Sequence, residues 1–278
     1  MTDVTPAGAP LGDLSTYDAW SFTSRGVSHP VYRRGDGPAV IVISELPGIS
    51  RQLLGFADRL VALGCSVALP DLFGGAGSDP LRAGLAEHVG GLGRIARACI
   101  SREFTVLATG RSSPITGWLR DLARHEHQRC GGPGVGVVGM CFSGGFALAM
   151  AVDPVVVAPV LAQPSLPFAV TGARRRSIDC GDADLDAVAE RCAGGLRVLG
   201  VRFEGDPLAP AERFAFLRER LGDAFLAVEL SQQDGHPGEP LPRHHSVLTL
   251  GLIDEPGEPT RAALDQVLEF LAARLEPR

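Results

Sequence analysis

The sequence predicts an α/β fold in which a mostly parallel central sheet is covered by helices on both faces. Three observations support this prediction. Apolar strand patterns alternate with amphipathic helix patterns, 45% of the residues are hydrophobic, and no repeat or long linker divides the 278 residues. We therefore expect a single domain over residues 18–278, preceded by a flexible arm over residues 1–17 that is rich in Pro, Gly and Ala.

Local patterns predict each element in turn. A run that is apolar on both faces, such as 39–44, is typical of a central parallel strand, whereas apolar residues at helical spacing, as in 51–63, predict a helix. The expected strands are 21–24, 26–33, 39–44, 65–69, 134–139, 155–161, 196–203 and 224–230. The expected helices are 51–63, 79–98, 114–129, 144–151, 184–192, 210–221 and 260–275.

Composition argues against several classes of function. The formal net charge of −6 is unlike that of a general nucleic-acid binder, because phosphate backbones are bound by basic surfaces. No apolar run approaches the roughly 20 residues of a membrane helix, and the first residues lack the basic and apolar regions of a signal peptide. We expect a cytoplasmic protein with no nucleic-acid or membrane partner, in which the six cysteines remain thiols.

No cofactor or metal is expected either. The cysteines and histidines lack the spacing of a zinc site. The glycines at 134, 136 and 139 match a dinucleotide-binding pattern, but they lie inside a predicted strand rather than in the turn that opens a helix.

The most informative stretch is residues 136–145, where a buried strand is followed by Gly139-Met140-Cys141-Phe142-Ser143 and then by a helix. A nucleophile between small residues at a strand-to-helix turn is typical of a nucleophile elbow. The helix N-terminus would also favour a thiolate. The alternative is a structural cysteine buried beside a glycine turn.

A catalytic cysteine needs a base, and the base needs a carboxylate to orient it. Asp206 follows the strand predicted at 196–203, and His244 and His245 follow the next strand. This is the chain order of nucleophile, acid and histidine found in α/β-hydrolases. Taken singly, Asp206 in Gly-Asp-Pro is a common turn residue and a loop histidine is usually solvated. Their occurrence in this order is therefore the signal.

At these residues the sequence resembles the dienelactone hydrolase family, over roughly residues 36–275, which implies an α/β-hydrolase fold. The family's elbow, Gly-x-Cys-x-Gly-Gly, is matched around Cys141 with Ser143 in place of a glycine. The family's acid maps onto Asp206. Its His-Ser pair maps onto His245-Ser246, so the resemblance favours His245 over His244 and, further, over His236.

The resemblance also implies roles at an early strand end, where Glu45 precedes a turn containing Gly48. Glu45 would help to deprotonate Cys141 when substrate binds, although a glutamate that caps the next helix is an alternative. The backbone N–H groups of Leu46 and Phe142 would form the oxyanion hole.

The expected activity is hydrolysis of a small ester or lactone through an acyl-cysteine intermediate, with a Cys141-His245-Asp206 triad and a small-molecule substrate. One alternative is a thioesterase or acyltransferase that uses the same site. Another is a non-catalytic binding protein or thiol redox sensor. Arg174, Arg175 and Arg176 could attract an anionic substrate, or they could form a solvated loop.

Overall fold

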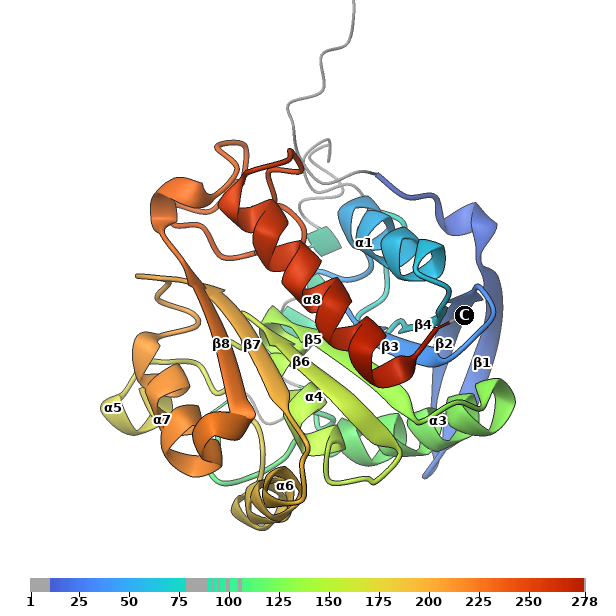
Figure 1. Ribbon diagram of the computed structural model, residues 1–278, viewed down its shortest axis with the longest axis horizontal. Helices are drawn as coiled ribbons and strands as arrows, with labels where there is room; N and C mark the ends of the chain where they lie inside the picture. The colour runs from blue at the N-terminus through green and yellow to red at the C-terminus, as the bar shows by residue number, and fades with distance from the viewer. Residues whose placement is uncertain are drawn as a thin grey trace, which may run out of the picture.

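The computed structural model describes residues 11–78, 90–91, 93–94, 96–98, 101–104 and 107–277. An eight-stranded sheet in the order β1-β2-β4-β3-β5-β6-β7-β8 crosses the molecule (Figure 1). Its strands are β1 (Asp18–Ser24), β2 (Val27–Arg34), β3 (Ala39–Ile43), β4 (Ser66–Pro70), β5 (Val135–Met140), β6 (Val156–Ala162), β7 (Val198–Phe203) and β8 (Phe225–Leu230). Strands β3 to β8 pair in parallel, whereas the β1–β2 hairpin joins β4 in antiparallel fashion. The predicted α/β fold is confirmed.

Helices cover both faces of the sheet. One core contains buried side chains of α3, α4, α6 and α7, and the other contains those of α1 and α8, which lie in front in Figure 1. The helices are α1 (Arg51–Ala62), α3 (Ile115–Cys130), α4 (Gly144–Met150), α5 (Gly172–Arg175), α6 (Asp182–Ala193), α7 (Ala211–Leu221) and α8 (Pro259–Leu275). Most of the helix predicted over 79–98 lies outside the described residues. No helix in the described ranges is apolar over enough of its length to span a membrane.

The two-sided burial of the central strands explains their uninterrupted apolar runs. Along β3, Ile41 and Ile43 belong to one core and Val40 and Val42 to the other, because successive strand residues point to opposite faces. Gly136 in β5 lets α8 approach the sheet closely, since a Cβ there would lie 2.9 Å from Leu271.

Residues 11–17, the described part of the predicted arm, pack against α1. The Gly12 N–H donates to the Arg51 carbonyl at 2.8 Å, and the buried Tyr17 hydroxyl donates to Asp58 at 2.8 Å. A short 3-10 helix, Leu14–Thr16, lies between them. This part of the segment therefore contributes to the packed domain rather than extending from it.

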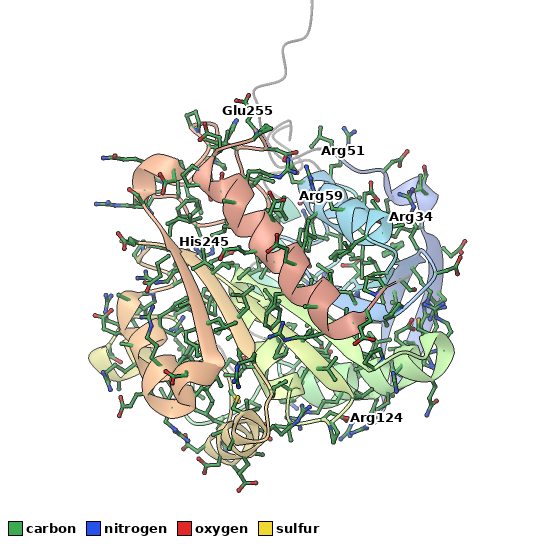
Figure 2. The ribbon with its side chains drawn as sticks, in the orientation of Figure 1. Arg34, Arg51, Arg59, Arg124, His245 and Glu255 are labelled. Atoms are coloured by element: carbon green, nitrogen blue, oxygen red, sulfur yellow. The ribbon has the colours of Figure 1, made fainter. Side chains whose placement is uncertain are left out.

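The parallel strands bring their carboxyl ends to one edge of the sheet, and ligands of open α/β sheets bind outside that edge. Glu45 follows β3, Cys141 follows β5 and Asp206 follows β7. His245 comes from the long connection between β8 and α8, and Figure 2 shows it close to one end of β7 and β8. Four residues that are far apart in sequence are thus delivered to one edge.

Candidate active site

Cys141 occupies a strained turn directly after β5. Its φ is +54°, a conformation that side chains with a Cβ rarely adopt, and such strain concentrates at functional sites. The turn requires small neighbours. A Cβ on Gly139 would lie 2.3 Å from the Ser143 carbonyl oxygen, and one on Gly144 would lie 2.6 Å from Pro164 Cα. The backbone therefore has the sharp strand-to-helix geometry of a nucleophile elbow.

Ser143, which stands where the family resemblance implies a glycine, connects the elbow to the end of β3. Its buried hydroxyl accepts from the Met140 N–H at 2.9 Å and lies within hydrogen-bond distance of the carbonyl oxygens of Ile43 (2.9 Å) and Ser44 (3.1 Å). The serine thereby ties the turn before Phe142 to the segment that leads into Leu46. These are the two residues whose backbone N–H groups are expected to hold an oxyanion.

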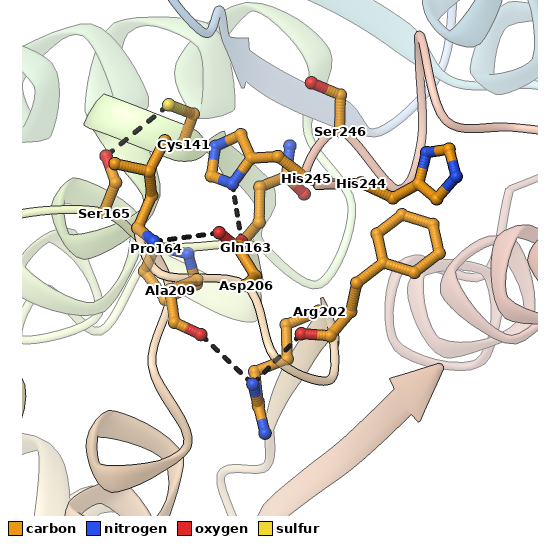
Figure 3. Close-up of polar contacts among 12 residues, drawn as sticks. Cys141, Gln163, Pro164, Ser165, Arg202, Asp206, Ala209, His244, His245 and Ser246 are labelled. Carbon is orange, nitrogen blue, oxygen red and sulfur yellow. Dashed lines mark hydrogen bonds and ion pairs between the residues drawn. The ribbon is translucent and has the colours of Figure 1, made fainter. Parts of the chain in front are cut away.

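His245 and Asp206 form a buried pair beside the cysteine. His245 Nδ1 lies 2.6 Å from Asp206 Oδ2, and the two side chains are only 3% and 1% exposed. Figure 3 shows the imidazole next to Cys141 with Nδ1 turned toward Asp206. Because Nδ1 is taken by Asp206, the buried Nε2 atom of His245 is the nitrogen left to interact with the Cys141 side chain. This nitrogen is placed to exchange a proton with the thiol.

The electrostatic surroundings of His245 favour its charged form. Burial alone would lower the pKa of the imidazole, but the neighbouring Cys141 sulfur and the hydrogen-bonded Asp206 carboxylate raise this pKa well above its ordinary value. An imidazole with a raised pKa is suited to hold a proton that it has taken from a thiol.

Buried polar groups fix the loop that carries Asp206. Asp206 Oδ1 accepts from the Leu208 N–H at 2.9 Å. The Arg202 guanidinium, at the end of β7, donates through Nη1 to the carbonyl oxygens of Phe203 (3.0 Å) and Ala209 (3.2 Å), as Figure 3 shows. These hydrogen bonds fix the main chain before and after Asp206, and so they fix the position of the carboxylate that faces His245.

Glu239 anchors the histidine loop and was not anticipated from the sequence. Its buried carboxylate accepts from the N–H groups of His245 (3.1 Å) and Ser246 (2.9 Å), and it lies 2.9 Å from His244 Nδ1. His244 therefore binds Glu239 and packs on Phe203, away from Cys141 (Figure 3). No local pattern around residue 239 could have revealed this role, because it depends on how the loop folds back on itself.

The third histidine has a different environment. His236 is buried, and its Nδ1 accepts from the Gly238 N–H at 3.0 Å. Burial lowers the pKa of His236, so the ring favours its neutral form. Of the three histidines considered, the structure brings His245 to the Asp206 carboxylate.

Glu45 is buried among hydroxyl groups at the end of β3. Its carboxylate accepts from Ser246 Oγ at 2.7 Å, from Thr249 Oγ1, and from Gln163 Nε2 at 3.4 Å. None of these described hydrogen bonds goes to Cys141. Burial raises the pKa of Glu45, although the hydroxyl donors oppose the shift. Ser50, not Glu45, caps α1, because its hydroxyl accepts from the Leu53 N–H at 3.1 Å.

Ser165 is a further neighbour of Cys141 that the sequence did not indicate. Its Oγ lies 3.5 Å from the Cys141 sulfur, and its N–H donates to the Cys141 carbonyl at 2.9 Å. Ser165 lies in the segment that follows β6, at the same edge of the sheet. Ser165 and His245 are therefore both neighbours of the Cys141 sulfur (Figure 3).

The arginine triplet lies on and beside α5 and faces other partners. Arg175 forms an ion pair with Glu212 at 2.8 Å, and Arg176 forms one with Glu219 at 2.6 Å, both at the protein surface. Arg174 Nε donates to the Leu107 carbonyl at 3.0 Å. None of these described contacts involves Cys141, Asp206 or His245, and a role for the triplet in attracting substrate stays a prediction.

Comparison with known proteins identifies the family. The model of the dienelactone hydrolase family matches residues 27–174, just over half of the 278 residues. The chain therefore belongs to the dienelactone hydrolase family, a family of hydrolases with the α/β-hydrolase fold. Comparison with curated proteins finds no match.

Solved structures with low sequence identity share the fold. The α/β hydrolase GrgF from Penicillium sp. sh18 has a TM-score of 0.59 at 14% identity, covering 94% of this chain and 99% of that one. A dienelactone hydrolase-like promiscuous phosphotriesterase from metagenomic libraries has a TM-score of 0.55 at 17% identity, covering 94% and 98%. A cold-adapted esterase from an Arctic intertidal metagenomic library has a TM-score of 0.53 at 14% identity, covering 93% and 94%.

Proposed function

We propose that this protein hydrolyses small esters or lactones through an acyl-cysteine intermediate, with Cys141 as nucleophile, His245 as acid–base and Asp206 as its orienting carboxylate. The observation that carries the proposal is the strained elbow at Cys141 beside an imidazole whose other nitrogen lies 2.6 Å from a buried carboxylate. Membership of a hydrolase family supports the same reaction class.

In the proposed first step, His245 accepts the proton of the Cys141 thiol, and the sulfur attacks the ester carbonyl carbon. The carbonyl π electrons move to oxygen, and the backbone N–H groups of Leu46 and Phe142 stabilise the oxyanion. Loss of one such donor typically costs about 3 kcal/mol of transition-state stabilisation. When the oxyanion collapses, the C–O bond to the leaving group breaks, and His245 protonates the departing alkoxide.

In the second step, His245 removes a proton from water, and the hydroxide attacks the thioester. Collapse of this second tetrahedral species returns the thiolate to Cys141, which regains its proton from His245, and releases the acid. For a lactone, acid and alcohol leave as one molecule. The alkoxide of an ester is a difficult leaving group that needs protonation, so the raised pKa of His245 serves this role.

We further propose that Glu45 assists thiol activation when substrate binds. A buried carboxylate with a raised pKa accepts a proton more readily than an exposed one. In the described structure its oxygens are occupied by Ser246 and Thr249, so assistance requires that a substrate displace these hydroxyl groups. This makes activation of the cysteine dependent on the ligand.

A substrate panel tests the proposed function. Aryl esters, lactones and acyl-thioesters are assayed with the wild type, Cys141→Ala and, as a matched control, Cys130→Ala, which alters a half-buried thiol at the end of α3. We expect turnover of esters and lactones by the wild type and Cys130→Ala and none by Cys141→Ala. Equal turnover by Cys141→Ala would refute the nucleophile. Turnover of thioesters alone would change the substrate class to that of a thioesterase.

A further inference from the structure

One fully buried arginine connects the loop of the triad acid to the segment beside the nucleophile. Arg213 lies on α7, and its Nη1 donates to the carbonyl oxygens of Pro164 (2.6 Å) and Leu208 (3.3 Å). Burial lowers the pKa of Arg213 to about 10, so the guanidinium remains charged at neutral pH. A charge is costly to bury unless hydrogen bonds satisfy it, and here carbonyl oxygens supply them.

The remaining donors of Arg213 hold the rest of the segment 164–177. Nη2 donates to the carbonyl oxygens of Pro167 (2.6 Å) and Arg174 (3.1 Å), and Nε donates to that of Ser177 (2.5 Å). A single planar group therefore fixes the main chain of this segment near both of its ends. Only an arginine offers donors that fork in this way, because a lysine ammonium is a compact point charge on a flexible stem.

Both carbonyl groups held by Nη1 belong to segments that contact the triad. Pro164 precedes Ser165, whose N–H binds the Cys141 carbonyl at 2.9 Å and whose hydroxyl lies 3.5 Å from the sulfur. Leu208 donates its N–H to Asp206 Oδ1 at 2.9 Å. Hydrogen bonds joined by short stretches of main chain, at Leu208 and at Pro164–Ser165, thus connect the Asp206 carboxylate, through Arg213, to the Cys141 carbonyl.

We propose that Arg213 is a positioning residue for the triad, which sets the separation between the Asp206 loop and the Cys141–Ser165 pair. The imidazole of His245 must span the gap between those two groups, so an error in their separation directly misaligns proton transfer. A displacement of about 1 Å in such a site can lower the rate by about a hundredfold. The role assigned to Arg213 rests on the proposed function of the triad.

The test compares Arg213→Lys and Arg213→Met with a matched control, Arg191→Met. Arg191 also donates to main-chain carbonyl groups, those of Asp153 (2.8 Å) and Pro154 (3.3 Å), but these precede β6 at the opposite edge of the sheet. For each variant, kcat and KM of ester hydrolysis are measured per folded molecule. In parallel, the rate at which iodoacetamide alkylates Cys141 is followed by mass spectrometry, which requires no substrate turnover.

We expect both Arg213 variants to lose kcat by about a hundredfold with little change in KM, and to alkylate more slowly at neutral pH. The retained charge of Arg213→Lys should not restore the rate. Arg191→Met should lose stability but keep its kcat per folded molecule. Wild-type kcat and alkylation in the folded Arg213 variants, or equal losses in Arg191→Met, would overturn the positioning role.

Arg213→Gln covers the case in which Arg213→Lys and Arg213→Met do not fold, because a side-chain amide still donates hydrogen bonds to main-chain carbonyl groups but cannot reach all of those that the guanidinium holds. We expect it to lower both kcat and the alkylation rate, and wild-type values for both would also overturn the proposal. The two readouts separate the possible failures. If the wild type hydrolyses no ester, the proposed function fails, whereas the alkylation rates still report whether Arg213 controls the environment of Cys141.

Discussion

At the residue scale, the proposed reaction depends on which imidazole exchanges a proton with Cys141. His245 binds the Asp206 carboxylate, whereas His244 binds Glu239 and His236 binds a loop N–H. We expect His245→Ala to lower kcat about a thousandfold, within the usual range for a positioned acid–base group. His236→Ala should retain most activity. Steady-state kinetics of the two alanine variants measure this, and a fully active His245→Ala would show that another base operates.

The pKa of His245 gives a pH dependence with a defined sign. Because this pKa is raised in the folded protein, the imidazolium persists to higher pH than in a free histidine. The interactions of the His245 imidazolium stabilise the folded state fully at pH values below about 6.5, the pKa of histidine in the unfolded chain. This stabilisation is lost as the pH rises through the pKa of His245 in the folded protein. Asp206→Asn removes the carboxylate, so the alkaline limb of kcat/KM should move to lower pH. An unchanged limb in the pH–rate profile would contradict the assignment.

We expect the ionised Glu45 carboxylate to lower the stability of the fold while it increases kcat. Its pKa is raised in the folded state, so keeping it ionised at neutral and alkaline pH opposes folding. Glu45→Gln should therefore unfold at higher urea concentration at alkaline pH, while kcat falls by about a hundredfold or more. Urea unfolding and kinetics on the same samples test both parts. A variant with unchanged kcat would show that Glu45 is structural only.

At the element scale, the elbow is held to the end of β3 by one hydroxyl. Ser143→Ala removes the partner of the Met140 N–H and of the carbonyl groups of Ile43, the last residue of β3, and Ser44, which follows it; all of these groups are buried. Unsatisfied buried groups of this kind cost about 1–3 kcal/mol. We expect that loss in the free energy of unfolding, together with a lower kcat.

The control for this prediction is Ser28→Ala, at an exposed position on the β1–β2 hairpin whose hydroxyl accepts from that of Thr23. It should change neither the unfolding free energy nor kcat appreciably. If Ser143→Ala behaved like this control, the hydroxyl would not join the two segments in any way that matters to the protein.

Some elements follow from local sequence and others do not. The all-apolar runs of β3 and β5 and the small residues around Cys141 are local signals, and the structure contains these strands and the sharp turn. The placement of β4 between β2 and β3 is not a local signal, because strand order depends on how crossovers pack. Likewise, the packing of residues 11–17 on α1 depends on single contacts of Gly12 and Tyr17 that composition does not reveal.

At the scale of the whole molecule, the parallel sheet brings residues that are far apart in the sequence to one candidate site. Asp206 and His245 lie 65 and 104 residues after Cys141, yet parallel strand ends bring them together. Order along the chain and family resemblance were enough to nominate these residues. Arg213 and Glu239 could not be nominated, because each acts on main-chain groups of a distant or refolded segment. Such contacts exist only after the fold has formed.

The proposed mechanism requires that Cys141 become acylated. The most direct measurement mixes the protein with an activated aryl ester, quenches with acid at short times, and determines intact mass followed by peptide mapping. We predict a mass increase equal to one acyl group on the peptide that contains Cys141, present in wild type and absent in Cys141→Ala. The mechanism would be contradicted if the wild type hydrolysed the ester without forming an adduct at any time and Cys141→Ala hydrolysed the ester at the same rate.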